Sequence, residues 1–152
     1  MYQVVIIGAG PVGGRLATEL ASRGISTLMI EEHAEIGRPF QCAGLVNPPA
    51  MQMVGLEDTI LQNVDGALIH SPSGIMVPVG KDGRVRTHVV CRKKFDQAVV
   101  AQAMEAGAHL WLLSKPIDAE VVKDGVNVKV EREGEIVEIR GAEGLNYRIS
   151  QI

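Results

Sequence analysis

Three glycines near the start of the chain, Gly8, Gly10 and Gly13, are spaced as G-x-G-x-x-G, and Glu31 ends the next apolar run. In this pattern the first glycine allows a tight turn, the second lets a pyrophosphate approach the backbone, and the third permits close helix–strand packing. A carboxylate at position 31 would accept hydrogen bonds from an adenosine ribose, whereas Glu32 is expected to face solvent. The pattern predicts a dinucleotide site and leaves FAD and NAD open, because both carry the same adenosine diphosphate end.

A second group that could do chemistry is the thiol of Cys42, in the loop-like run EIGRPFQCAGLV at 35–46. A cysteine thiol is mostly protonated at neutral pH, which suits a proton donor better than a nucleophile. The alternative is a small apolar residue used only for packing, which is the role we expect for Cys91 in its strand pattern. The cysteines and histidines lack metal-ligand spacing, so we expect no metal site.

Apolar periodicity predicts the elements that position these residues. Residues 3–31 read as strand, helix and strand, a βαβ unit with a parallel pair, and 32–46 read as a loop. Asn47, followed by two prolines, is a plausible helix start, and one or two short helices are expected between there and residue 64. A hairpin is expected around 71–74, followed by a strand at 86–92.

The second half of the chain returns to helical spacing. Residues 93–107 predict a helix and 108–113 a strand, which would form a second crossover into the same sheet. Alternation over 119–139, with turns at Asp124-Gly125 and Glu133-Gly134, predicts a three-stranded antiparallel meander. Residues 140–152 show no clear period. The fold class is therefore α/β.

Composition narrows the class of protein further. The chain has 152 residues and a formal net charge of −3, with acidic and basic residues interspersed, which argues against a nucleic-acid partner. Two cysteines far apart suit a reducing compartment, and no apolar run approaches the roughly 20 residues of a membrane span. We expect a cytoplasmic protein whose contact with a membrane, where there is one, is peripheral.

Three segments together resemble one family. VVIIGAGPVGGRLATELASRGISTLMIEE, EIGRPFQCAGLV and VVCRKKFDQAVVAQAMEAGAHLWL are similar, in order and spacing, to the FAD-dependent geranylgeranyl reductases, within the flavoprotein group that includes p-hydroxybenzoate hydroxylase. The resemblance implies FAD as cofactor and a Rossmann-like FAD-binding domain with a parallel sheet and an antiparallel β-meander, of the glutathione reductase/p-hydroxybenzoate hydroxylase type, here incomplete. It also implies reduction of C=C bonds in isoprenoid chains, such as those of archaeal membrane lipids or chlorophyll-type pigments. The implied partners are an isoprenoid lipid substrate and an external electron donor, NAD(P)H or ferredoxin.

The resemblance also assigns roles to individual residues. It places Gly8, Gly10, Val12 and Gly13 along the FAD pyrophosphate, and the carboxylate of Glu31 at the adenosine ribose. It places Arg92 at the phosphate or sugar portion of FAD, and the backbone near Ile117 at the adenine. The loop of Cys42, Ala43 and Leu45 would lie beside the flavin ring. Cys42 is the candidate catalytic residue, as a proton donor or as a residue that shapes the pocket.

Members of that family are much longer than this chain. We therefore expect a truncated FAD-binding domain: a fingerprint and flavin loop (1–46), a partial substrate-side insertion (47–91), a helix, strand and β-meander (92–140), and an irregular tail (141–152). Such a chain would be a fragment, a truncated gene product or one half of a split protein. The alternatives are a stand-alone NAD-binding module and a non-catalytic truncated remnant.

Overall fold

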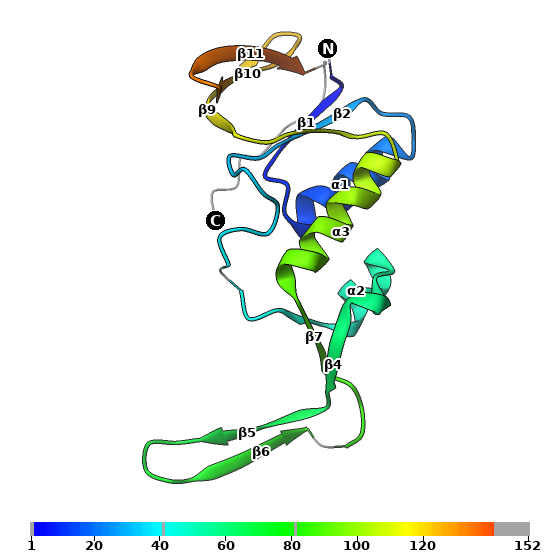
Figure 1. Cartoon of the computed structure of the whole chain (residues 1–152), viewed down its shortest axis with the longest axis vertical. Coiled ribbons are helices and arrows are strands. Elements are labelled where there is room, and N and C mark those ends of the chain that lie inside the picture. The colour runs from blue at the N-terminus through cyan, green and yellow to red at the C-terminus, as the bar shows by residue number, and fades with distance from the viewer. Residues whose placement is uncertain (1, 41, 81, 142–152) are drawn as a thin grey trace. The chain divides into compact units, whose positions relative to one another are not determined.

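The computed structural model describes residues 2–40, 42–80 and 82–141 (Figure 1). The chain divides into two compact units, 1–38 with 96–152, and 39–95. Of the predicted tail, the residues from 142 onward lie outside the described part. Among the described residues, no helix has the length and apolar character needed to cross a membrane.

The first unit is built on a parallel sheet of three strands. β1 (Val4–Ile7), β2 (Thr27–Ile30) and β8 (His109–Trp111) lie in the order β1-β2-β8. All four residues of β2 are buried. A strand buried along its whole length suits a parallel sheet covered on both faces. The predicted βαβ unit and the second crossover into the same sheet are confirmed.

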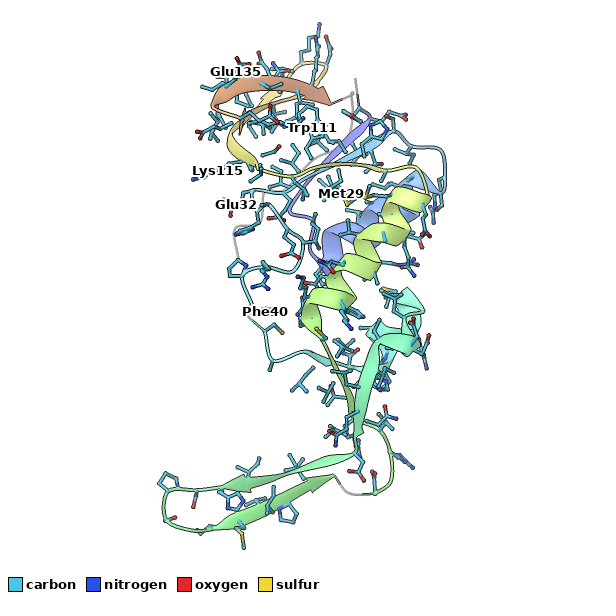
Figure 2. The ribbon with its side chains drawn as sticks, viewed as in Figure 1. Met29, Glu32, Phe40, Trp111, Lys115 and Glu135 are labelled. Carbon is cyan, nitrogen blue, oxygen red and sulfur yellow. The ribbon has the colours of Figure 1, made fainter. Side chains whose placement is uncertain are left out.

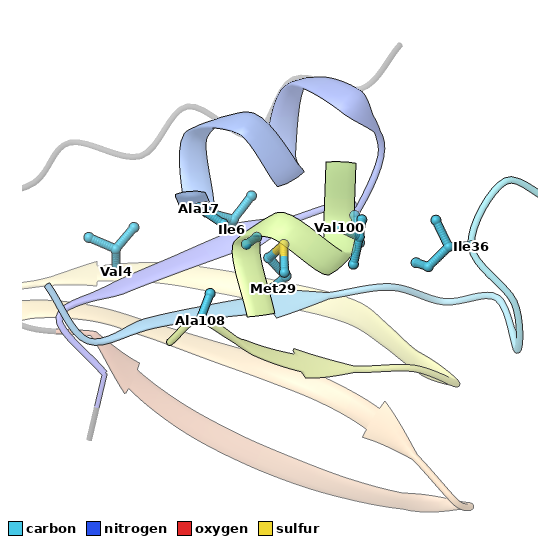
Figure 3. Close-up of a cluster of buried hydrophobic side chains, with 9 residues drawn as sticks. Val4, Ile6, Ala17, Met29, Ile36, Val100 and Ala108 are labelled. Atoms are coloured by element: carbon cyan, nitrogen blue, oxygen red, sulfur yellow. The ribbon is translucent and has the colours of Figure 1, made fainter. Parts of the chain in front are cut away.

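Successive side chains of the sheet pack against different layers. On one side, a buried cluster joins the sheet to helix α1 (Pro11–Ala21) and to α3 (Arg92–Glu105), whose residues from Asp96 onward belong to this unit. Figure 3 shows side chains of this cluster pointing from the sheet toward the helices; they include Val4, Ile6 and Met29. On the other side, the neighbouring residues Val5, Leu28 and Ile30 pack against the meander. The two-residue period of the strands thus places the side chains of Val4 to Ile6 and of Leu28 to Ile30 alternately in two cores.

The meander matches its prediction closely. β9 (Ser114–Val122), β10 (Gly125–Arg132) and β11 (Glu135–Gly141) form an antiparallel sheet in the order β11-β10-β9. The second predicted turn is made by Glu133 and Gly134, both with positive φ (54° and 81°). β9 begins earlier than the predicted residue 119, because a bulge between its pairs with Lys129 and Val130 interrupts the alternation that the sequence would show.

The second unit contains a three-stranded sheet in the order β3-β7-β4 and a separate hairpin, β5-β6. Asn47 caps the helix as predicted, since its Oδ1 accepts a hydrogen bond from the Ala50 N–H (2.8 Å). The expectation of short helices through residue 64 is wrong for residues 60–64, which form a strand because they pair with β7. The elements are β3 (Leu45–Val46), α2 (Pro48–Val54), the 3-10 turn η1 (Glu57–Thr59), β4 (Ile60–Val64), β5 (Gly66–His70), β6 (Met76–Gly80) and β7 (Thr87–Val90).

Because α1 packs closely on α3, replacing one glycine of α1 by alanine should destabilise the chain, whereas this substitution normally stabilises a helix. Replacing glycine by alanine inside a helix normally stabilises by about 0.5–1 kcal/mol. A Cβ on Gly14, however, would lie 2.9 Å from Cγ1 of the fully buried Val99. We expect Gly14→Ala to destabilise the chain by about 1–3 kcal/mol in denaturant unfolding.

The control for this prediction is the same substitution in a Val99→Ala background, which removes the clashing methyl group. We expect the loss from Gly14→Ala to shrink or reverse there, as a positive coupling in a double-mutant cycle. Equal losses in the two backgrounds would show that the packing of α1 on α3 is not the cause.

Candidate dinucleotide-binding site

The glycine loop connects β1 to α1 and is tied to the neighbouring strand. Gly8 has a φ of +94°, a conformation that favours glycine, and its N–H donates to the Ile30 carbonyl (2.8 Å) at the end of β2. This bond holds the start of the loop beside the point where β2 ends. The first glycine therefore makes the tight turn that the sequence predicted.

The other two glycines of the fingerprint have different reasons to lack a side chain. A Cβ on Gly13 would lie 2.1 Å from the Gly8 carbonyl oxygen and 3.2 Å from Cγ2 of Ile6, so internal packing requires glycine there. Gly10 has φ −81°, which any residue adopts, and a Cβ on it would meet no atom within 4 Å. Its packing against the described residues does not require glycine, and the open space in front of it fits the close approach of a ligand.

The first turn of α1 is arranged to receive negative charge. Its N-cap, Gly10, offers no side-chain acceptor, Pro11 occupies the first helical position, and the first turn holds no acidic residue. Val12, in this turn, is 84% exposed. The N–H groups of a first turn lack intrahelical acceptors and carry the positive end of the helix dipole, so a pyrophosphate is the type of group that fits this end of the helix.

Glu31 follows β2 and is held by the glycine loop. Its Oε2 accepts a hydrogen bond from the Ala9 N–H (3.0 Å), and its Oε1 accepts one from the His33 N–H (3.1 Å) and lies 2.6 Å from His33 Nδ1. The Glu31 side chain is only 15% exposed. Glu32, labelled in Figure 2, is exposed, as the sequence predicted. The carboxylate that the sequence assigned to the ribose is therefore the one fixed next to the fingerprint.

The ends of β2 and β8 are joined just beyond the sheet. The Glu31 N–H donates to the Trp111 carbonyl (2.8 Å), and the Ser114 N–H donates to the Glu31 carbonyl (2.9 Å). Ile117 lies further along, at the bulge of β9, and is 46% exposed. The residues bonded to the Glu31 backbone thus precede Ile117, whose place beside the adenine stays a prediction.

In the second unit, the loop that carries Cys42 is locked to β7. Gly44 is buried with φ +76°, its carbonyl accepts from the Val90 N–H (2.8 Å), and a Cβ on it would lie 2.3 Å from the Val90 carbonyl oxygen. On either side of Gly44, Cys42 and Leu45 are exposed, as is Ala43. This loop is therefore a fixed turn that presents its side chains outward.

Arg92, the first residue of α3, lies beside the same turn. Its Cγ is 3.6 Å from the position that a Cβ would take on Gly44. The structure thus brings together, within the second unit, two cofactor positions that the sequence predicted separately, the Cys42 loop and Arg92. Their roles toward a cofactor stay predictions.

Sequence reasoning missed three residues that shape these sites. Ala9 supplies the N–H that holds Glu31, and His33, considered only as a metal ligand, is the second residue that binds this carboxylate. Gly44 makes the turn after Cys42. A glycine directly before the short strand LV was a usable signal for Gly44, whereas a pairing between residues 31 and 33 inside a loop has no periodic signal.

A parallel sheet with a glycine loop at the end of its first strand, an uncapped helix N-terminus and a carboxylate after the second strand defines a dinucleotide-binding domain. The chain belongs to the FAD binding domain family, which it matches over residues 1–110. FAD is accordingly the cofactor of this domain, and the choice between FAD and NAD that the glycines left open is decided.

Two curated relatives point to a narrower group. The chain is 38% identical over 148 residues to the digeranylgeranylglycerophospholipid reductase of Picrophilus torridus, covering 91% of this chain and 37% of that protein. It is 35% identical over 159 residues to the protein of the same name from Methanocaldococcus jannaschii, covering 99% of this chain and 40% of that protein. The resemblance to the geranylgeranyl reductases is confirmed, and the chain spans about two fifths of the length of these relatives.

The fold comparison agrees. The structure of a geranylgeranyl bacteriochlorophyll reductase-like protein from Thermoplasma acidophilum superposes with a TM-score of 0.79 at 32% identity, covering 92% of this chain and 37% of that one. The predicted Rossmann-like fold with a parallel sheet and a β-meander is confirmed by this match and by the observed topology.

Two of the fingerprint glycines, Gly10 and Gly13, predict effects of different size on stability. We expect Gly13→Ala to destabilise the chain at the upper end of the about 1–3 kcal/mol that overpacking costs, because the added Cβ meets a backbone oxygen. Gly10→Ala should cost at most about 1 kcal/mol, the penalty for alanine at an N-cap, because its Cβ enters open space. Denaturant unfolding of both variants measures this, and equal losses would contradict the division of roles.

Proposed function

We propose that the chain is the N-terminal, FAD-binding part of a flavin-dependent oxidoreductase that reduces C=C bonds of isoprenoid, geranylgeranyl-type chains in lipid biosynthesis. The observation that carries the proposal is that nine tenths or more of this chain matches proteins named digeranylgeranylglycerophospholipid reductase. The open space at Gly10 and the carboxylate of Glu31 support it, because they supply the two features that the adenosine diphosphate end of FAD needs.

In this proposal the first unit binds the adenosine diphosphate end. The backbone around Gly8, Gly10, Val12 and Gly13 faces the pyrophosphate, where the first-turn N–H groups of α1 act as donors. Glu31 accepts a hydrogen bond from the adenosine ribose, and the backbone near Ile117 is assigned to the adenine.

The second unit contributes the loop of Cys42, Ala43 and Leu45 toward the flavin ring, and Arg92 toward the phosphate or sugar portion of the cofactor. The exposure of Cys42, Ala43 and Leu45 supports the assignment, because a bound cofactor contacts side chains that lie at the surface. A guanidinium carries a permanent charge and several donors in a fixed geometry, which suits phosphate binding by Arg92.

An isolated C=C bond has no adjacent carbonyl to stabilise charge, so its reduction needs both a hydride and a proton. Bound FAD would, once reduced, supply the hydride. Of the residues assigned to the flavin loop, Cys42 is the one with an acidic hydrogen, on Sγ, and we assign it to hold the proton.

The substrate is an isoprenoid lipid, and the external electron donor is NAD(P)H or ferredoxin. The chain works in the cytoplasm, with at most peripheral membrane contact.

Binding of FAD to the purified chain tests the first part of the proposal. We expect weak binding, in the micromolar range or above (about −8 kcal/mol or less favourable), because a chain that spans two fifths of its relatives supplies only part of the cofactor contacts. Gly10→Ala should weaken it at least about tenfold with a smaller loss of stability than Gly13→Ala, since a Cβ enters the space assigned to the pyrophosphate. Flavin fluorescence quenching measures both affinities.

NAD is the matched control ligand, because it shares the adenosine diphosphate end but lacks the flavin; its binding is measured by isothermal titration calorimetry, since flavin fluorescence does not report it. Tight NAD binding without measurable FAD affinity would overturn the proposal in favour of a stand-alone NAD-binding module. If the Gly10→Ala variant bound FAD with the affinity of the wild-type chain, the pyrophosphate would not lie against the glycine loop.

The role of Cys42 is best tested in a full-length relative that has cysteine at the aligned position. We expect Cys42→Ala and Cys42→Ser to lower the rate of alkene reduction by about 10²-fold, the usual contribution of a positioned acid, with FAD affinity unchanged. An alanine variant with nearly full activity would restrict the cysteine to shaping the pocket.

A further inference from the structure

We propose that His33 is a positioning residue for the cofactor: its imidazole fixes the Glu31 carboxylate so that Oε2 is the oxygen that receives an adenosine ribose hydroxyl. This inference rests on the proposed function, in which Glu31 accepts a hydrogen bond from that ribose. It assigns the choice of oxygen to a side chain outside the glycine fingerprint.

The hydrogen bonds of the carboxylate carry the proposal. Oε1 accepts from the His33 N–H (3.1 Å) and lies 2.6 Å from His33 Nδ1, and Oε2 accepts from the Ala9 N–H (3.0 Å). An ionised carboxylate offers two lone pairs on each oxygen. Oε1 is therefore filled by His33 alone, whereas Oε2 keeps one lone pair for a further donor.

The short contact between Nδ1 and Oε1 also defines the state of the ring. A carboxylate oxygen only accepts, so Nδ1 must carry the proton, in the neutral ring or in the imidazolium. The backbone N–H and Nδ1–H of one residue thus converge on one oxygen and close a small ring around it. A carboxylate held in this way has little freedom to rotate about its terminal torsion.

The environment makes this restraint matter. Glu31 is 15% exposed, so its charge depends on donors from the protein, and His33 supplies two of the three donors described. The His33 backbone is itself fixed, because its carbonyl accepts from the Leu113 N–H (3.2 Å), between β8 and β9. Removing the imidazole would leave Oε1 half-satisfied and let the carboxylate turn, so that part of the ordering cost would be paid when the ribose binds.

The test compares variants that differ in the donor at this position. His33→Asn keeps an N–H donor, because the Asn Nδ2 takes the place of the imidazole Nδ1. His33→Ala removes the donor, and His33→Phe removes it while keeping a ring, which serves as a second variant if alanine lowers stability. The probes are ADP, the end shared with FAD, and 2′,3′-dideoxy-ADP, which lacks the ribose hydroxyls, titrated by NMR.

We expect His33→Ala and His33→Phe to weaken ADP binding about fivefold, as for the loss of one hydrogen bond, and to leave dideoxy-ADP binding unchanged. His33→Asn should bind ADP within about twofold of the wild type. In the chain without ligand, the Ala9 amide resonance should shift in the Ala and Phe variants and stay in place in the Asn variant, because this amide reports the orientation of Oε2.

Three results would overturn the inference while leaving the proposed function intact: full ADP affinity of the Ala and Phe variants, equal losses for ADP and dideoxy-ADP, or an Ala9 amide that does not respond. A wild-type chain that binds neither ADP nor FAD would instead overturn the proposed function, and the inference with it.

Discussion

The fold of the first unit depends on the burial of β2 on both of its faces. Met29 faces the helices while Leu28 and Ile30 face the meander, and none of the three has any exposed surface. The helices and the meander must therefore both pack on one four-residue strand. Each Å² of apolar surface that they remove from water stabilises the fold by about 25 cal/mol. The same constraint determines where the chain leaves the sheet, so that Glu31 emerges beside the glycine loop and beside the end of β8.

Glycines in this chain have two kinds of role, which the amino-acid sequence alone does not distinguish. Gly13 and Gly14 let backbones and helices approach, and Gly44 allows a loop to lie against β7, so each has an internal reason to lack a side chain. Gly10 has no such reason among the described residues. Where internal packing does not require a glycine, the open space beside it indicates that a ligand approaches the backbone there.

Most of the first unit could be predicted from the sequence, because each of its elements has a clear period or turn signal. The βαβ unit, the second crossover and the second meander turn, Glu133-Gly134, follow from alternation, helical spacing and turn signals. The first turn lies one residue before the predicted Asp124-Gly125, because Gly125 already pairs with Val122. Residues 60–64 were missed because a short apolar run is compatible with either helix or strand until its partner strand is known. The contacts of Glu31 with Ala9 and His33 were missed for a related reason: they are loop geometry, which depends on where two strands end.

The first unit is discontinuous along the chain, since residues 39–95 intervene between its two segments. During synthesis, β1, α1 and β2 therefore leave the ribosome well before α3, β8 and the meander that bury them. The nascent chain must keep a strand as apolar as β2 from improper association until residue 139, the last member of its second core, has emerged. Folding of this unit is thus dominated by long-range contacts and should be slow, and its demand for chaperones should be greatest during translation of the intervening segment.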